Sequence, residues 1–226
     1  MHIEPGLVTG AKLLLGYGTA AAAAGYTVKL SFNSMREKGI ISLVLRSAIT
    51  TGLVFTFFEV LPHFRVGVSE VHFILGSTLF LIFGSAPAAI GLSLGLLIQG
   101  ALLEPQDIPQ FGMNVTTLLV PLFALSTLAH RIIRAETPYT DLRYSQVLTL
   151  STAYQAGVVL WVAFWALYGG GATLENIAAI GSFAGSYVIV VLIEPILDVA
   201  VLALAKSLRP LRDSWIVTPR LHHGAH

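Results

Sequence analysis

Residues 177–204 read IAAIGSFAGSYVIVVLIEPILDVAVLAL, and this apolar stretch decides the class of the fold. A helix crosses the bilayer core with roughly 20 apolar residues, so the stretch is long enough to span a membrane. Of the 226 residues in the chain, 55% are hydrophobic and 11% are charged. Soluble domains carry about 25% charged residues. The sequence therefore predicts a multi-pass protein of the cell (inner) membrane, and it excludes a water-soluble globule and a disordered chain.

Short polar breaks divide the chain into seven apolar runs, which predict an all-α bundle of about seven transmembrane helices. The run at 71–83 would be only ~20 Å long as a helix, so we expect it inside the bundle. We expect residues 1–207 to form a single transmembrane domain and residues 208–226 a cytoplasmic tail. The runs cover residues 10–30, 40–61, 71–83, 86–103, 113–128, 145–168 and 177–204.

The charges predict the orientation and exclude several partners and sites. Most of the 13 Lys and Arg residues fall on the cytoplasmic side if the N-terminus lies outside and the C-terminus inside. A net charge of +1 gives no basic footprint for nucleic acid.

The chain has no cysteine, which excludes disulfides and thiolate metal sites. No signal peptide is recognisable, so we expect Met1 to be the first residue of the mature chain.

The opening Met1-His2 can chelate a divalent ion. The terminal amine, the His2 amide nitrogen and His2 Nδ1 close two adjacent chelate rings and lie in one plane. Planar nitrogen donors suit Ni²⁺ and Cu²⁺, and low-spin Co²⁺ uses the same geometry. Affinity should rise with pH because the amide must lose its proton. The following Glu4-Pro5-Gly6 predicts a turn that folds the terminus back.

A second ligand is predicted at His72, at the outer end of the third helix. Ionisable groups at membrane depth are a functional hypothesis by default, although a hydrogen-bonded packing role is an equal alternative. Glu70 and the loop residue His63 are candidates for guiding a cation. Gln99 and Asn114 are candidates for hydrogen bonds to a ligand histidine.

Small and acidic residues within the helices admit more than one interpretation. Gly91 and Gly95 fit G-x-S-x-G, but inside an apolar helix they favour close helix packing over a nucleophile elbow. Glu194 and Asp198 share one helix face and serve either an ion path, a partner contact or structural hydrogen bonds. A further small-residue face, which serves either another subunit or intramolecular packing, comprises Gly16, Ala20 and Ala24.

Together these features resemble the CbiM/NikM family, the substrate-binding membrane subunits of energy-coupling-factor transporters for cobalt and nickel. The resemblance covers about the first 130 residues and departs in Ile3-Glu4-Pro5-Gly6, where relatives more often place proline before the acid. It also departs in the residues before His72, which lack the usual glycine-rich run. The blocks that carry it are Met1-His2-Ile3, Val71-His72-Phe73, Gly76-Ser77-Thr78, 97–102 and 111–115.

The resemblance implies that Met1, His2 and His72 bind Co²⁺ or Ni²⁺ as the transported substrate, with no prosthetic cofactor. It also implies a transmembrane coupling (T) subunit, cytoplasmic ATPase subunits and an optional small accessory membrane subunit as partners. The chain has no Walker A loop, so ATP hydrolysis would belong to a partner. The alternatives are a vitamin-binding subunit of the same transporter class, a membrane-embedded enzyme or assembly factor, and a stand-alone channel. Ligand preference does not separate cobalt from nickel.

Overall fold

The computed structural model describes residues 2–135 and 137–207, so the predicted tail at 208–226 lies outside the described residues. A β-hairpin of β1 (Phe64–Val66) and β2 (Ser69–Val71) interrupts an otherwise helical chain. Short 3-10 helices lie at Gly10–Lys12, Pro105–Gln110 and Tyr139–Asp141. The α-helices are α1 (Leu13–Lys38), α2 (Ile40–Val60), α3 (Gly76–Phe83), α4 (Ser85–Leu102), α5 (Phe111–Ile132), α6 (Tyr144–Gly170) and α7 (Leu174–Ser207).

The described residues therefore contain the seven predicted helices, and five of these stretches are long and apolar enough to cross a membrane. These are α2, α4, α5 with the preceding 3-10 helix, α6 and α7. The eight-residue α3 spans only ~12 Å and lies inside the bundle, as predicted. The fold is that of a multi-pass membrane protein. The N-outside orientation remains a prediction.

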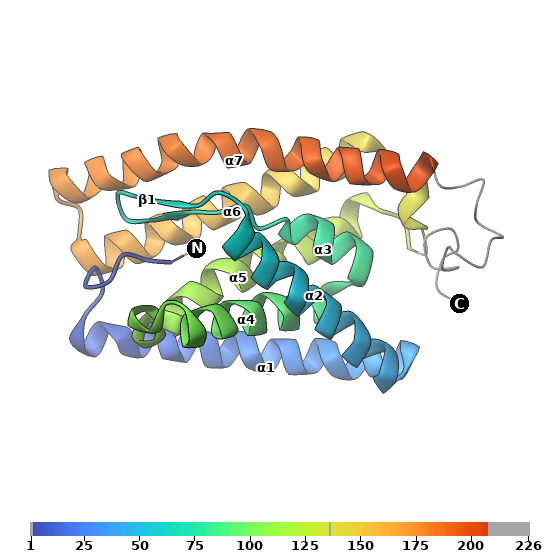
Figure 1. Cartoon of the computed structure of the whole chain (residues 1–226), viewed down its shortest axis with the longest axis horizontal. Coiled ribbons are helices and arrows are strands. Elements are labelled where there is room, and N and C mark those ends of the chain that lie inside the picture. Colours follow the sequence, from blue (N-terminus) through green and yellow to red (C-terminus); the bar gives the residue numbers. More distant parts are fainter. Residues whose placement is uncertain (1, 136, 208–226) are drawn as a thin grey trace.

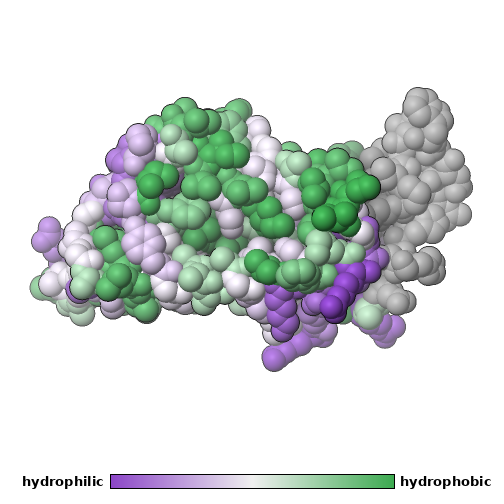
Figure 2. All heavy atoms as spheres, turned by 90° about the horizontal axis from the view of Figure 1, so that it is seen from below, coloured by the Kyte–Doolittle hydropathy of each residue, from purple (hydrophilic) through white to green (hydrophobic). Residues whose placement is uncertain are grey.

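Figure 1 shows α1 along one edge of the bundle and α7 along the opposite edge, with the other helices between them. The surface is rich in exposed leucine, isoleucine and valine, including Ile41, Leu160 and Ile196. Figure 2 shows apolar side chains over much of one face and a hydrophilic group at one end. Apolar flanks with charged ends suit a bilayer.

Glycines set the closest helix contacts. A Cβ on Gly91 would lie 2.4 Å from Thr50 Oγ1, and one on Gly95 would lie 2.6 Å from Val54 Cγ1. The interpretation of this segment as a packing face is therefore confirmed, with α2 as its partner. Gly112 of α5 likewise lies against α1, because a Cβ there would approach the Gly16 carbonyl oxygen to 2.8 Å.

The predicted start of the third helix at residue 71 is wrong, since α3 begins at Gly76. Val71 belongs to β2, and the segment that follows it, including His72, is neither helix nor strand. The Glu194 carboxylate of α7 accepts a hydrogen bond from the Ile74 N–H. In a helix that began at residue 71, this N–H would instead donate to a carbonyl oxygen of the helix itself. Leu75 adopts a left-handed conformation with φ of 52° at the junction.

The acidic pair in α7 makes the structural hydrogen bonds that were one of the interpretations of its sequence. Glu194 also accepts a hydrogen bond from Gln155, and Asp198 accepts hydrogen bonds from Ser77 and Thr78 of α3. Both acids are fully buried. Two buried carboxylates thus hold the start of α3, and with it the segment that carries His72, against α7.

The Gly91 contact gives a stability prediction. We expect Gly91→Ala to lower the free energy of unfolding by about 1–3 kcal/mol, because the new methyl group would overlap Thr50 across the α2–α4 contact. The matched control is Gly25→Ala, where nothing lies within 4 Å of the added Cβ. Thermal unfolding in detergent measures both, and equal melting temperatures for the two variants would contradict the close packing.

Candidate metal site

The N-terminal segment lies inside the protein, beside β2, to which a single isolated bridge joins it. Ile3 forms an antiparallel bridge with Ser69, and the Glu70 N–H donates to the His2 carbonyl oxygen at 3.1 Å. The Ser69 hydroxyl donates to the same carbonyl oxygen at 2.8 Å. On the other side, the Ile3 N–H donates to Asn114 Oδ1 of α5 at 2.8 Å. His2 and Ile3 are buried, so the terminus is held between the hairpin and α5.

The predicted turn explains how the chain reaches this position. The Leu7 N–H donates to the Glu4 carbonyl oxygen at 3.1 Å, which closes a four-residue turn with Pro5 and Gly6 at its centre. Gly6 has φ of 89°, the left-handed conformation that the third residue of a type II turn requires. The reversed order of acid and proline therefore still forms a tight turn.

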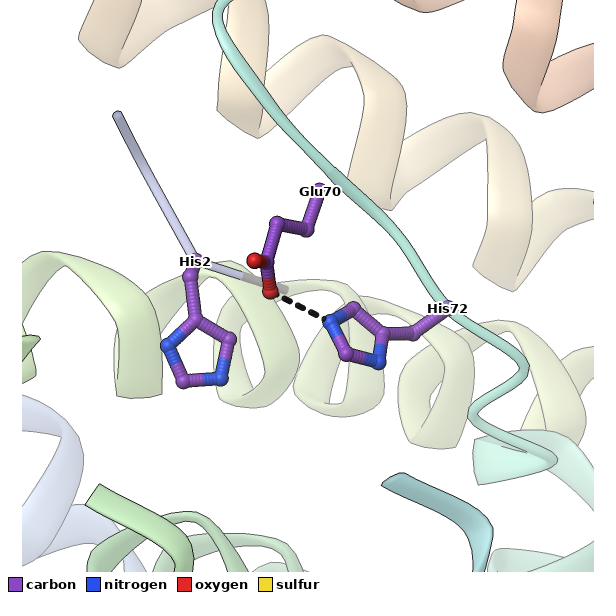
Figure 3. Close-up of side chains that lie close together, drawn as sticks. All are labelled: His2, Glu70 and His72. Atoms are coloured by element: carbon purple, nitrogen blue, oxygen red, sulfur yellow. Dashed lines mark hydrogen bonds and ion pairs between the residues drawn. The ribbon is translucent and has the colours of Figure 1, made fainter. Parts of the chain in front are cut away.

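Three side chains converge where this segment meets β2. Single donor atoms of His2, Glu70 and His72 all lie within 4.8 Å of one another. The ring centroids of His2 and His72 are 5.6 Å apart, and Figure 3 shows the Glu70 carboxylate close to both rings. Two imidazoles and one carboxylate at this spacing are a donor set for a divalent transition metal.

Glu70 lies within the group of donor atoms, whereas the sequence predicted only that it guides a cation toward the site. Its Oε2 accepts a hydrogen bond from His72 Nε2 at 2.8 Å, and its Oε1 accepts one from Arg65 Nε at 2.6 Å. Burial raises the pKa of Glu70, but the hydrogen bonds from His72 and Arg65 outweigh burial and hold the pKa well below its usual range. Burial lowers the pKa of His72 to about 3, against the opposing effect of Glu70. Glu70 is thus an anion and His72 a neutral ring at physiological pH.

Gln99 makes the contact proposed for it, to His2. Its Oε1 lies 3.0 Å from His2 Nε2. An amide oxygen only accepts hydrogen bonds, so Nε2 carries the hydrogen. This leaves Nδ1, the atom that would close the terminal chelate, facing away from Gln99.

Two acidic residues that the sequence did not single out, Glu104 and Asp107, also lie beside His2. His2 Nδ1 forms an ion pair with Asp107 and lies 3.6 Å from Glu104 Oε2. Burial, and next the negative charge of Glu70, raise the pKa of Glu104. The available signal was their position directly after the helix that carries Gln99, at the end of the bundle where the N-terminus lies.

The remaining predicted residues divide into those near the site and those away from it. His63 is exposed and stacks on His72, with ring centroids 5.0 Å apart and planes 10° apart. Met1 lies outside the described residues, so its ligand role remains a prediction. Gly16 serves the contact with α5 described above. Ala20 and Ala24 border an apolar groove of about 470 Å³ between α1, α4 and α5, and their role in docking a subunit remains a prediction.

One family model and two solved structures match the chain. The CbiM family, described as "Cobalt uptake substrate-specific transmembrane region", matches residues 2–212. A solved structure described as a transition metal transporter aligns with a TM-score of 0.66 at 18% identity over 96% of each chain. Another, described as a truncated transition metal transporter, aligns with a TM-score of 0.63 at 18% identity over 92% of this chain and 97% of that one. These two likenesses show the fold alone. No curated protein matches the chain.

The hydrogen bond from Ile3 to Asn114 gives a prediction about the terminal segment. We expect Asn114→Ala to leave the buried Ile3 amide unpaired, at a cost of about 1–3 kcal/mol to the docked segment. Hydrogen exchange at Ile3 should then be roughly 5- to 150-fold faster. Asn33→Ala, at an exposed position of α1, is the matched control. Unchanged exchange in Asn114→Ala would contradict the docking role.

The depressed pKa values of His72 and Glu70 predict that acid destabilises the protein. The ordinary pKa of histidine is 6.5, so the unfolded chain binds a proton at His72 from pH 6.5 downward, while the folded protein binds it only near pH 3. The stabilisation from ionised Glu70 is present above its ordinary pKa of 4.5 and is lost below it. The melting temperature should therefore fall as the pH decreases from about 6.5.

Melting curves at pH 7.5, 5.5 and 4.5 measure this dependence. His72→Phe removes the titrating ring, so its melting temperature should fall less than that of the parent between pH 6.5 and 4.5. A melting temperature that rises with acid in the parent protein would contradict the burial of a neutral His72.

Proposed function

Since the chain belongs to the CbiM family, the substrate-specific membrane component of cobalt and transition metal uptake transporters, we propose that it captures Co²⁺ or Ni²⁺ with the ligands Met1, His2 and His72. The metal is the transported substrate, and the family is a transporter component, not an enzyme family. The terminal amine, the His2 amide nitrogen and His2 Nδ1 supply three donors, and His72 supplies the fourth.

The observation that carries this proposal is the burial of His2 beside His72 and Glu70. An N-terminal residue with a titratable side chain is usually solvated, because burying it costs free energy unless it has partners. Here two contacts from β2 and one from Asn114 hold the backbone of this segment in place. The position of His2 beside an internal histidine supports the proposal.

The supporting contacts favour metal binding. Gln99 accepts a hydrogen bond from His2 Nε2, and Nδ1 of the same ring faces the carboxylates of Glu104 and Asp107, which attract a cation to this nitrogen. Glu70 orients the His72 ring through Nε2 and adds negative charge next to the ion. His63 stacks over His72 from the exposed side and reduces its contact with solvent.

Release of the ion into the cell requires partners in this proposal. The chain would assemble with a transmembrane coupling subunit and cytoplasmic ATPase subunits, and a small accessory membrane subunit would be optional. The apolar groove beside Ala20 and Ala24 is the candidate contact surface. A vitamin-binding subunit is the second candidate in the same class, but the polar donor set around His2 favours a metal ion over an organic ring.

Metal binding by the purified full-length protein tests the proposal. We expect His2→Ala and His72→Ala each to weaken Co²⁺ and Ni²⁺ binding at least about tenfold, because each removes a donor. An added residue before Met1 should have a similar effect, because it displaces the terminal amine. Affinity should rise with pH, since the amide nitrogen binds only after losing its proton.

His130→Ala is the matched control, since this histidine is exposed in the last turn of α5. It should bind metal like the parent protein. Isothermal titration with each ion, together with metal content by mass spectrometry, gives the affinities and the preferred ion. Tight binding that survives all three changes would refute the ligand assignment, and a vitamin screen would follow.

A further inference from the structure

A second group of donors lies on the other side of His2. Donor atoms of His2, Glu104 and Asp107 lie within 4.8 Å of one another. His2 Nδ1 forms an ion pair with Asp107 Oδ2 and lies 3.6 Å from Glu104 Oε2. The two acids come from the loop and 3-10 helix between α4 and α5, whereas Glu70 and His72 come from the hairpin side.

Among the described residues, the buried carboxylate oxygens of this group contact only the other members of the group. No further group in the described part of the chain donates a hydrogen bond to either oxygen of Asp107 or to Oε2 of Glu104. His2 Nδ1 is buried too, and Gln99 already accepts the hydrogen on Nε2. Buried carboxylates normally accept hydrogen bonds from nearby groups. A divalent cation bound among these atoms would satisfy the carboxylate oxygens that the rest of the described chain leaves without donors.

Charge and exposure indicate how a cation reaches this position. The carboxylates of Glu70, Glu104 and Asp107 share one nearby guanidinium, Arg65, so the cluster attracts positive charge. The Glu104 side chain is 21% exposed, whereas those of Asp107 and His2 are each 2% exposed. Exposure therefore decreases from Glu104 inward to His2.

We propose that Glu104, Asp107 and His2 Nδ1 form a capture subsite for a hydrated divalent cation, which binds there before the ion passes to the nitrogen ligands. This inference rests on the proposed function, since His2 Nδ1 takes part in both steps. Carboxylate oxygens and an imidazole bind a divalent ion without deprotonating an amide. The terminal chelate needs that deprotonation, so it forms more slowly. The acids hold the ion next to Nδ1 during this step.

Mn²⁺ separates the subsite from the chelate, because it prefers oxygen ligands and stands lowest in the affinity order of divalent metals. We would titrate Mn²⁺ into the purified full-length protein and follow free Mn²⁺ by electron paramagnetic resonance. The parent protein should bind Mn²⁺. Asp107→Asn should bind it at least tenfold more weakly, and Glu104→Gln should also bind it more weakly. Glu175→Gln, an exposed acid in the first turn of α7, should bind like the parent.

Stopped-flow mixing with Ni²⁺ tests the order of events. Asp107→Asn should lower the association and dissociation rate constants by a similar factor, at least tenfold, because a group that contacts the ion only on its way in does not change the equilibrium affinity. A variant that associates at the parent's rate but dissociates faster would show that Asp107 is a ligand of the final complex, and this would overturn the inference. Mn²⁺ binding that Asp107→Asn leaves unchanged would also overturn it.

The controls separate failure of the inference from failure of the proposed function. A parent protein that binds Ni²⁺ tightly but not Mn²⁺ refutes the capture subsite and leaves the chelate intact. A parent protein that binds neither ion refutes both. If Asp107→Asn does not fold, Glu104→Gln at the partly exposed position decides, and unchanged Mn²⁺ binding and Ni²⁺ association in that variant would overturn the inference.

Discussion

The insertion of the N-terminal segment between the hairpin and α5 is the constraint on which the site depends. Backbone hydrogen bonds join this segment to β2. On the other side, Asn114 Oδ1 accepts a hydrogen bond from the Ile3 N–H. The segment lies within the protein, where an unpaired amide or carbonyl would cost about 1–3 kcal/mol. The same bonds that satisfy the backbone therefore fix the position of His2 relative to His72.

The hairpin that receives this segment is itself held by the longest helix. A Cβ on Gly67, at the tip of the hairpin, would lie 2.1 Å from the Ala179 carbonyl oxygen, so only glycine allows the hairpin to lie on α7. Further along α7, Glu194 and Asp198 hold the beginning of α3. The two ends of the segment that carries Glu70 and His72 thus rest on one rigid element. A displacement of α7 would move the internal histidine relative to His2.

The site combines strong negative charge with low solvent exposure. Carboxylates from three positions face two imidazole rings, and one guanidinium offsets part of their charge. Buried carboxylates are stable when cations or hydrogen-bond donors accompany them. This balance makes the cluster suited to a doubly charged ion, and it distinguishes the site from the buried acids of α7, whose partners are hydrogen-bond donors of the protein itself.

The sequence by itself determined the helical membrane class, most helix positions, the Pro5-Gly6 turn and the residues His2, Glu70, His72, Gln99 and Asn114 as candidates. Apolar runs and turn residues report local free energies, which depend on neighbours in the chain. The tertiary structure alone decided the late start of α3, the hairpin, and the place of Glu104 and Asp107 beside His2. The start of α3 and the place of the two acids depend on contacts between residues about 100 positions apart, such as those of Ile74 with Glu194 and of His2 with Asp107. Chain folding, and not local pattern, sets the free energy of such contacts.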